Sequence, residues 1–203
     1  MNDHPRSLLQ FAAAPTHPSP LDKSALVVVD AQLEYVTGKL RLNGIDAAIT
    51  ETEALLALAR RHKMPVFHII QHSRPGAALF DPAGPIVAIV PPLTPIAGED
   101  IVIKTLPNAF AGTELHQLIQ KTKRKELILA GFMTHNCISS TARAALDLGY
   151  RTTIVASATA TRDLPDPVGG TTPAEIVQQG TLSALADRIA IVVPKTAALL
   201  ASE

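Results

Sequence analysis

The segment ELILAGFMTHNCISSTARAALDLGYRTTIVAS (126–157) sets the expected fold, because a strand, a helix and a second strand follow one another within it. Its two ends, 126–131 and 151–157, carry apolar runs without regular polar alternation, which is typical of strands covered on both faces. Between them, over 136–148, apolar side chains recur at helical spacing, and Gly149 provides a stop. This order predicts a parallel β–α–β unit.

The same alternation extends in both directions along the chain. Four further apolar runs predict strands at 25–31, 65–71, 100–104 and 189–193, and longer amphipathic segments predict helices at 45–63, 112–123 and 172–187. Six strands that alternate with helices indicate a three-layer α/β/α fold, in which helices cover both faces of a parallel sheet.

Length and composition fit one compact domain. At 203 residues, with 47% hydrophobic and 18% charged residues, the chain can bury a large core. We expect this domain at 24–203, preceded by an irregular arm at 1–23, where four prolines oppose both helix and sheet. Within the domain, the proline- and glycine-rich segment 72–99 is long enough to be a candidate lid or substrate-binding loop.

Charge and hydropathy narrow the possible partners. Eighteen basic and eighteen acidic residues leave a formal net charge of zero, which argues against a nucleic-acid or membrane-surface partner and favours a small molecule. The apolar runs are shorter than the roughly 20 residues that cross a bilayer, and the N-terminus lacks the core of a secretory signal, so we expect a cytoplasmic protein. Neutral, apolar composition also favours a homo-oligomer, either a dimer or a tetramer.

Three polar residues follow predicted strands and are candidate site residues. Asp30 ends the run ALVVVD, Lys104 ends DIVIK, and Cys137, the only cysteine, lies shortly after ELILAG. Ligands of open parallel sheets bind beyond the carboxyl ends of the strands. We therefore expect these three side chains to converge.

Together, the three side chains have the parts of a nucleophilic site. A helix start and a nearby cation both favour a thiolate. Lys104 supplies the cation, and Asp30 can accept and return a proton. Backbone N–H groups at a helix start capped by Thr134 or Asn136 can form an oxyanion hole for a carbonyl substrate. Taken singly, Cys137 is more often buried filler, Asp30 a turn former and Lys104 a structural ion-pair partner.

Four segments resemble, in order, the motifs of the isochorismatase-like cysteine hydrolase superfamily, which includes nicotinamidases and N-carbamoylsarcosine amidases. They are VVVDAQ, VIKTLPNAFAGTEL, GFMTHNCISSTARAALDLGY and ATATRD, within residues 24 to 194. The resemblance implies a six-stranded parallel sheet of order 3-2-1-4-5-6, and a Cys137–Asp30–Lys104 triad that cleaves a carbon–nitrogen bond through a thioester. It also implies a cis peptide bond before Met133 and an oxyanion hole formed by the amides of Met133 and Cys137.

Five residues near the triad are candidates for substrate contact: Gln32, His72, Phe80, Phe132 and Thr134. For Gln32 the alternative is that it fixes the turn after Asp30, and for Phe80 it is a plain surface loop. Nicotinamidases bind a metal through an aspartate and histidines after the second strand, whereas here that strand runs into HIIQHSRPG. We therefore expect no metal and no other cofactor.

Two rival functions stay open. The first is isochorismatase-type hydrolysis of a vinyl ether by Asp30 and Lys104, independent of Cys137. Since true isochorismatases usually lack the nucleophilic cysteine, Cys137 favours an amide-type substrate. The second is a non-catalytic binding or assembly protein. A dinucleotide-binding oxidoreductase is disfavoured, because VVVDAQLEYVTGKL contains no G-x-G-x-x-G pattern.

Overall fold

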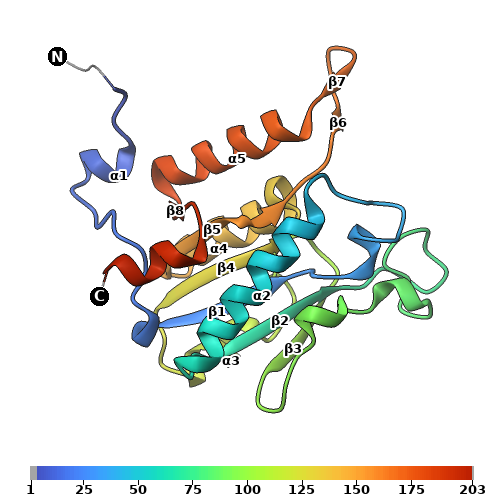
Figure 1. Ribbon diagram of the computed structural model, residues 1–203, viewed down its shortest axis with the longest axis horizontal. Coiled ribbons are helices and arrows are strands. Elements are labelled where there is room, and N and C mark those ends of the chain that lie inside the picture. Colours follow the sequence, from blue (N-terminus) through green and yellow to red (C-terminus); the bar gives the residue numbers. More distant parts are fainter. Residues whose placement is uncertain (1–3, 203) are drawn as a thin grey trace.

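The computed structural model describes residues 4–202 and is built around one six-stranded parallel sheet (Figure 1). Its order is β3-β2-β1-β4-β5-β8, which confirms the expected order 3-2-1-4-5-6. The sixth sheet strand is labelled β8 because a small hairpin of two strands, which was not predicted, precedes it. The strands are β1 (Ser24–Val29), β2 (Val66–Gln71), β3 (Asp100–Lys104), β4 (Glu126–Phe132), β5 (Arg151–Ala160) and β8 (Ile191–Val193), with β6 (Leu164–Pro165) and β7 (Thr171–Thr172) in the hairpin.

Helices cover both faces of the sheet, as predicted (Figure 1). One face packs against α2 (Ile45–Arg61), and the other packs against α3 (Leu115–Lys121), α4 (Ser139–Asp147) and α5 (Ala174–Arg188). Every residue of β1 is buried, because this central strand has neighbours on both edges and helices on both faces. The core is therefore two apolar layers, one on each side of the sheet.

Three helices begin later than the sequence predicts, and the one expected at 172–187 does so by only two residues. The helix expected at 112–123 starts at Leu115, because Gly112 takes a left-handed φ of 68° and the Thr113 hydroxyl donates to the Ala109 carbonyl. The helix expected at 136–148 is divided. A π-type helical turn, Thr134–Ile138, comes first, and α4 follows it directly.

The N-terminal arm is not irregular throughout. Residues Leu8–Phe11 form a single helical turn, α1, which Ser7 and Gln10 close through reciprocal side-chain bonds. Prolines flank this turn at 5 and 15 but are absent between them, so a short helix is allowed there. The amide of Leu8 donates to Asp187 on α5, which ties the arm to the domain.

The long segment 72–99 folds over the chain that follows β1. It contains two 3₁₀ turns, Pro85–Val87 and Pro91–Leu93, and an antiparallel bridge joins Ile89 to Gln32. Three other 3₁₀ turns lie outside this segment. One precedes β1 (Leu21–Lys23), one follows β1 (Leu33–Tyr35), and one lies at the C-terminal end (Thr196–Ser202). Across the described residues, no helix has the length and apolar character needed to cross a membrane.

Candidate functional site

The three anchor residues do converge beyond the carboxyl ends of β1, β3 and β4. The Lys104 Nζ lies 2.8 Å from Asp30 Oδ2 and 3.4 Å from Cys137 Sγ. The side chains of Asp30 and Lys104 are fully buried, and Cys137 is only 4% exposed. One buried ammonium group therefore contacts both the carboxylate and the sulfur.

A close approach of two strands positions Asp30. Gly131 on β4 pairs with Val29, the residue before Asp30, and has a φ of 111°. A Cβ at Gly131 would lie 2.0 Å from the Val29 carbonyl oxygen, so only glycine fits there. Asp30 itself takes a left-handed φ of 50°, an uncommon conformation that aspartate tolerates better than most residues. The chain thus leaves the sheet at Asp30.

Gln71, which the sequence analysis did not select, is the fourth member of the cluster. It ends β2, and its Oε1 accepts a hydrogen bond of 2.6 Å from Lys104 Nζ. Its own side-chain amide donates to the His72 carbonyl at 3.0 Å, which holds the side chain in place. Gln71 closes an apolar strand just as Asp30 and Lys104 do, so the same rule could have found it. We refer to Asp30, Gln71, Lys104 and Cys137 as the site cluster.

Burial dominates the electrostatics of the site cluster. It raises the pKa of the Asp30 carboxyl, although Lys104 opposes the rise. Burial and then the charge of Asp30 raise the pKa of the Cys137 thiol to about 12, and Lys104 offsets only part of this. The helix start and the nearby cation favour a thiolate, but desolvation of the sulfur outweighs them. The resting form is the neutral thiol.

Asp30 keeps acceptor capacity for a proton. Although Lys104 is 2.8 Å away, neither carboxylate oxygen of Asp30 accepts a hydrogen bond of good geometry within the described part of the chain. Buried carboxylate oxygens are normally saturated with donors. An unsatisfied one, beside a thiol, is suited to accept a proton during a reaction.

The segment that carries Cys137 has a free backbone donor at Met133. It starts with a cis peptide bond between Phe132 and Met133. The Met133 carbonyl accepts hydrogen bonds from the amides of Asn136, at 3.1 Å, and Ile138, at 3.2 Å, so a ligand cannot use these two amides. The Met133 amide has no hydrogen-bond partner among residues 4–202, and it is thus available to a ligand.

The expected helix caps are wrong. No side chain caps either the π-type turn or α4. The Thr134 hydroxyl instead donates to the Ala160 carbonyl at 3.0 Å, and the neighbouring His135 Nδ1 lies 2.6 Å from the Thr161 hydroxyl. Both contacts fasten the Cys137 turn to the end of β5, a role that depends on tertiary packing and not on local sequence.

The residues expected to contact substrate are mostly occupied within the protein. The fully buried Gln32 amide donates to the carbonyls of Gln71 and Val87 and accepts from the Gln71 amide, so it fixes the turn after Asp30. Thr134 is committed to Ala160, as described above. His72 remains partly exposed, directly after β2, and is the best placed of the five.

The two phenylalanines pack on Tyr35 and not toward an open cleft. Phe132 is fully buried, with its ring centroid 5.9 Å from that of Tyr35. Phe80 is 8% exposed, and its ring centroid lies 5.4 Å from that of Tyr35. The segment 72–99 therefore contributes Phe80 to an aromatic cluster around Tyr35, and Phe80 is not an exposed surface residue.

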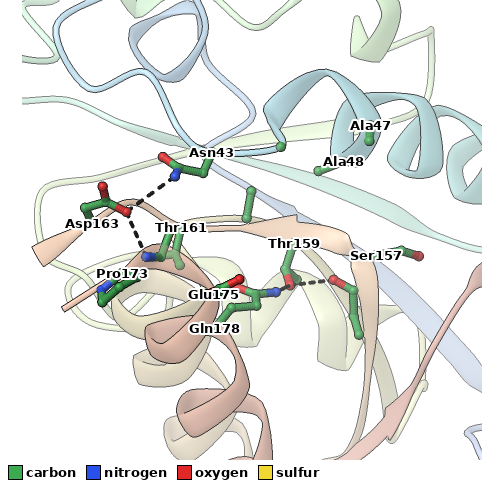
Figure 2. Close-up of a pocket in the computed structure, with 14 residues that line it drawn as sticks. Asn43, Ala47, Ala48, Ser157, Thr159, Thr161, Asp163, Pro173, Glu175 and Gln178 are labelled. Atoms are coloured by element: carbon green, nitrogen blue, oxygen red, sulfur yellow. Dashed lines mark hydrogen bonds between the residues drawn. The ribbon is translucent and has the colours of Figure 1, made fainter.

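A cavity of about 540 Å³ lies beside the site but does not include it. Figure 2 shows its walls, which are the start of α2, the end of β5 and the start of α5. Asp163 accepts from Asn43 and from the Ala174 amide at one end, and Gln178 donates to Thr159 at the other. None of the site cluster lines this cavity, so it is not the chamber in which Cys137 would react.

The described residues hold no group of three or more His, Cys, Asp or Glu side chains close enough to bind a metal ion. His68 on β2 and His72 just after it contact different parts of the protein. His68 is buried and contacts Glu99, whereas the His72 amide donates to the Lys104 carbonyl. A cation in the site cluster is already present as Lys104.

Comparisons with known proteins place these features in context. A family model described as the isochorismatase domain matches residues 24–193. The chain is 33% identical to the secreted isochorismatase effector Isc1 of Verticillium dahliae, over 78% of this chain and 84% of that one. It is 30% identical to the maleamate amidohydrolase of Pseudomonas putida, over 66% and 70%. The crystal structure of an isochorismatase from Pseudomonas putida KT2440 superposes with a TM-score of 0.89, at 37% identity, over 96% and 98% of the two chains.

Proposed function

Because the chain belongs to the isochorismatase family of hydrolases, we propose that it cleaves a carbon–nitrogen bond of a small amide or carbamoyl-type substrate through a thioester on Cys137. One observation carries this proposal: the Lys104 ammonium contacts both the Asp30 carboxylate and the Cys137 sulfur in a buried cluster. The amide substrate of the maleamate amidohydrolase relative supports the same bond type.

In the first step, the Cys137 thiol gives its proton to Asp30 as the sulfur attacks the substrate carbonyl carbon. The raised pKa of Asp30 narrows the gap to the thiol, which makes the transfer less costly. Negative charge moves from the Asp30 carboxylate by way of the sulfur to the carbonyl oxygen, and the Lys104 ammonium, which contacts both Asp30 and the sulfur, stabilises the charge as it leaves these two groups. Proton transfer is thus coupled to attack, and no thiolate accumulates beforehand.

In the second step, the tetrahedral oxyanion collapses and the carbon–nitrogen bond breaks. The amides of Met133 and Cys137 donate to the oxyanion, and Asp30 returns its proton to the leaving nitrogen. Water then attacks the thioester while Asp30 accepts a proton from it, and the acid product leaves as Cys137 regains a thiol. Each turnover consumes one water and returns every group to its starting form.

Trapping the thioester tests this proposal. The purified protein is incubated with a panel of small primary amides and carbamoyl compounds, quenched in acid within the first turnover, and analysed by intact mass spectrometry. We expect an acyl adduct on Cys137, and a loss of turnover on the order of 10⁴ in Cys137→Ala. Cys137→Ser serves as the isosteric comparison and should be nearly as inactive.

A second function is favoured by one specific observation. Because the thiol pKa is raised to about 12 and the carboxyl pKa is also raised, a protonated Asp30 could donate a proton to a vinyl ether, with Cys137 as a bystander. The similarity to a secreted isochorismatase effector is compatible with this chemistry. Full activity of Cys137→Ala on isochorismate, with no adduct on any amide, would establish the ether reaction and remove the thioester proposal.

A further inference from the structure

The edge strand β3 carries an uncovered apolar surface. Four large apolar side chains lie within eleven residues and are each about half exposed: Ile96 at 52%, Ile101 at 51%, Ile103 at 54% and Leu106 at 53%. We call these four residues the β3 patch. The other large exposed apolar residues are scattered over the arm, α4, the β6–β7 hairpin, α5 and the C-terminal turn. The patch is therefore a local feature and not a general property of the surface.

The patch is exposed because no helix of the chain covers this corner of the sheet. Within β3, Val102 points toward the α3 layer and is buried, so Ile101 and Ile103 point toward the opposite face. On that face α2 packs mainly over β1, β4 and β5, and Ile101 and Ile103 stay about half exposed. Within the described chain, the backbone of 101–103 makes no hydrogen bond except to β2.

The opposite edge of the sheet is protected. At β8, residues of the N-terminal arm and residues 190–192 line one shared cavity of about 320 Å³, so the arm lies along that edge. Ile191 and Val193 of β8 are only 9% and 6% exposed. Proteins normally blunt a free sheet edge with proline, charge or a covering segment. Residues 101–103 have none of these devices, which indicates that another chain covers them.

The sequence of β3 is self-complementary when the strand meets a second copy of itself. In an antiparallel pair centred on Val102, all five residues of DIVIK are paired, and Ile101 lies opposite Ile103 of the partner copy. Residues directly opposite share a face of the sheet, so isoleucine meets isoleucine, and Val102 meets Val102. A slip of one residue would put each isoleucine on the wrong face. No like charges oppose each other in this register.

We propose that β3 pairs antiparallel with β3 of a second copy across a two-fold axis, which joins two six-stranded sheets into one. The size of the exposed surface around β3 supports a second copy of the chain as the partner. Ten of the fourteen residues 94–107 are exposed, and a stable dimer uses about 20–30 residues on each side. This single stretch thus supplies roughly a third to a half of an interface, and its neighbours must supply the remainder. Because Lys104 ends β3, the interface would also brace the strand that carries the cation of the site.

The oligomeric state tests the proposal. Sedimentation equilibrium of the full chain, from about 1 to 100 μM, should give a dimer. The variant Ile101→Lys/Ile103→Lys should be a monomer over the same range, with an unchanged circular dichroism spectrum. Ile176→Lys on α5 is the matched control, since Ile176 is 53% exposed, and it should remain a dimer. A monomeric wild type, or a dimer that persists in the β3 double variant, overturns the proposal.

A second measurement tests the register and does not depend on how the lysine variants fold. Ile101→Cys and Ile103→Cys proteins are oxidised separately and after mixing, with a reducing control. Directly opposite residues have the spacing that a disulfide needs, whereas diagonal ones are farther apart. We expect a cross-linked dimer in the mixture and little in either protein alone. Equal cross-linking in all three samples, or none in any, contradicts a pair centred on Val102.

Discussion

Two charged clusters contact β2, one at its C-terminal end through Gln71 and one nearer its start through His68, and they differ in how fully their charges are satisfied. In the site cluster, neither Asp30 oxygen accepts a well-directed hydrogen bond, and burial raises the pKa of this carboxyl. In the second cluster, Glu99 accepts bonds from Arg60 at 2.8 and 3.0 Å, from His68 at 2.9 Å and from the Ile96 amide at 3.0 Å. The pKa of Glu99 falls to about 2.

The contrast shows that burial alone does not decide what a carboxylate can do. Donors on all sides fix Glu99 in one ionised state, so it ties the end of the 72–99 segment to α2 and β2. Asp30 has one strong cation and spare acceptor capacity, so its protonation can change at modest cost. We refer to Arg60, His68 and Glu99 as the Glu99 cluster. Substitutions in the site cluster should therefore lower turnover, whereas substitutions in the Glu99 cluster should lower stability.

Asp30→Asn should have the largest effect, and it should change turnover and the reactivity of the Cys137 thiol in opposite directions. We expect turnover to fall by on the order of 10³ to 10⁴, since the proton acceptor is lost. Alkylation of Cys137 by iodoacetamide should instead become faster at a given pH, because the Asp30 charge raises the pKa of the thiol. Mass spectrometry of alkylation against pH, beside a turnover assay, measures both. Asp22→Asn, at an exposed acid, is the control, and slower alkylation in Asp30→Asn would refute the account.

Glu99→Gln should lower stability and leave the chemistry intact. Arg60 loses its carboxylate, but its guanidinium stays partly exposed, so we expect a cost of about 1 to 3 kcal/mol, below that of breaking a fully buried ion pair. Urea denaturation at pH 7 measures this loss, with the exposed Glu53→Gln on α2 as the matched control. The turnover number per folded molecule should be unchanged. A variant as stable as wild type would mean that Glu99 contributes no net stability.

Several features of both clusters follow from sequence. Asp30, Lys104 and Cys137 were predicted because each follows an apolar strand, and parallel strands bring their carboxyl ends to one edge. Gln71 ends β2 and obeys the same rule, so the sequence contains the signal for it as well. The strand order came from the resemblance, since local pattern cannot rank six similar strands.

Other features could not be read from the sequence for a physical reason. The Glu99 cluster joins residues 31 and 39 positions apart, and only the path of the 72–99 segment brings them together. The raised pKa of Cys137 depends on the burial of its sulfur, which tertiary packing sets and the local sequence does not show. A helix start and a nearby cation favour a thiolate, but neither reports the desolvation that raises the pKa of the thiol.

Gln71→Leu should have an intermediate effect on the site cluster. It removes the 2.6 Å acceptor of Lys104, and loss of such an orienting partner typically costs about 10- to 100-fold in activity. Gln71→Glu keeps an acceptor but adds a second negative charge near the sulfur, so it should slow alkylation of Cys137. The exposed Gln120→Leu is the control. If Gln71→Leu keeps full turnover and an unchanged alkylation profile, Gln71 does not position Lys104.

His68→Gln should have the smallest effect, and it isolates one source of acid sensitivity in the Glu99 cluster. Burial lowers the pKa of His68, so the neutral ring is the folded form and donates to Glu99. A lowered folded pKa adds stability that is complete above the unfolded value of about 6.5 and is lost as the pH falls. Glutamine can make the same donation, so at pH 7 we expect a change below about 1 kcal/mol.

The pH dependence of unfolding separates the contributions of His68 and Glu99, the two titrating members of the Glu99 cluster. Wild-type stability should decline from about pH 6.5, through His68, and more steeply below about pH 4.5, through Glu99. His68→Gln should reduce the first slope and keep the second, since burial also lowers the pKa of His135, which retains part of the first slope, whereas the exposed His62→Gln should leave both unchanged. Urea unfolding at pH 7, 5.5 and 4 resolves the two slopes. If the first slope is unchanged in His68→Gln, that acid sensitivity arises outside the Glu99 cluster. The Glu99 carboxylate would then be the only member of this cluster that makes stability depend on pH.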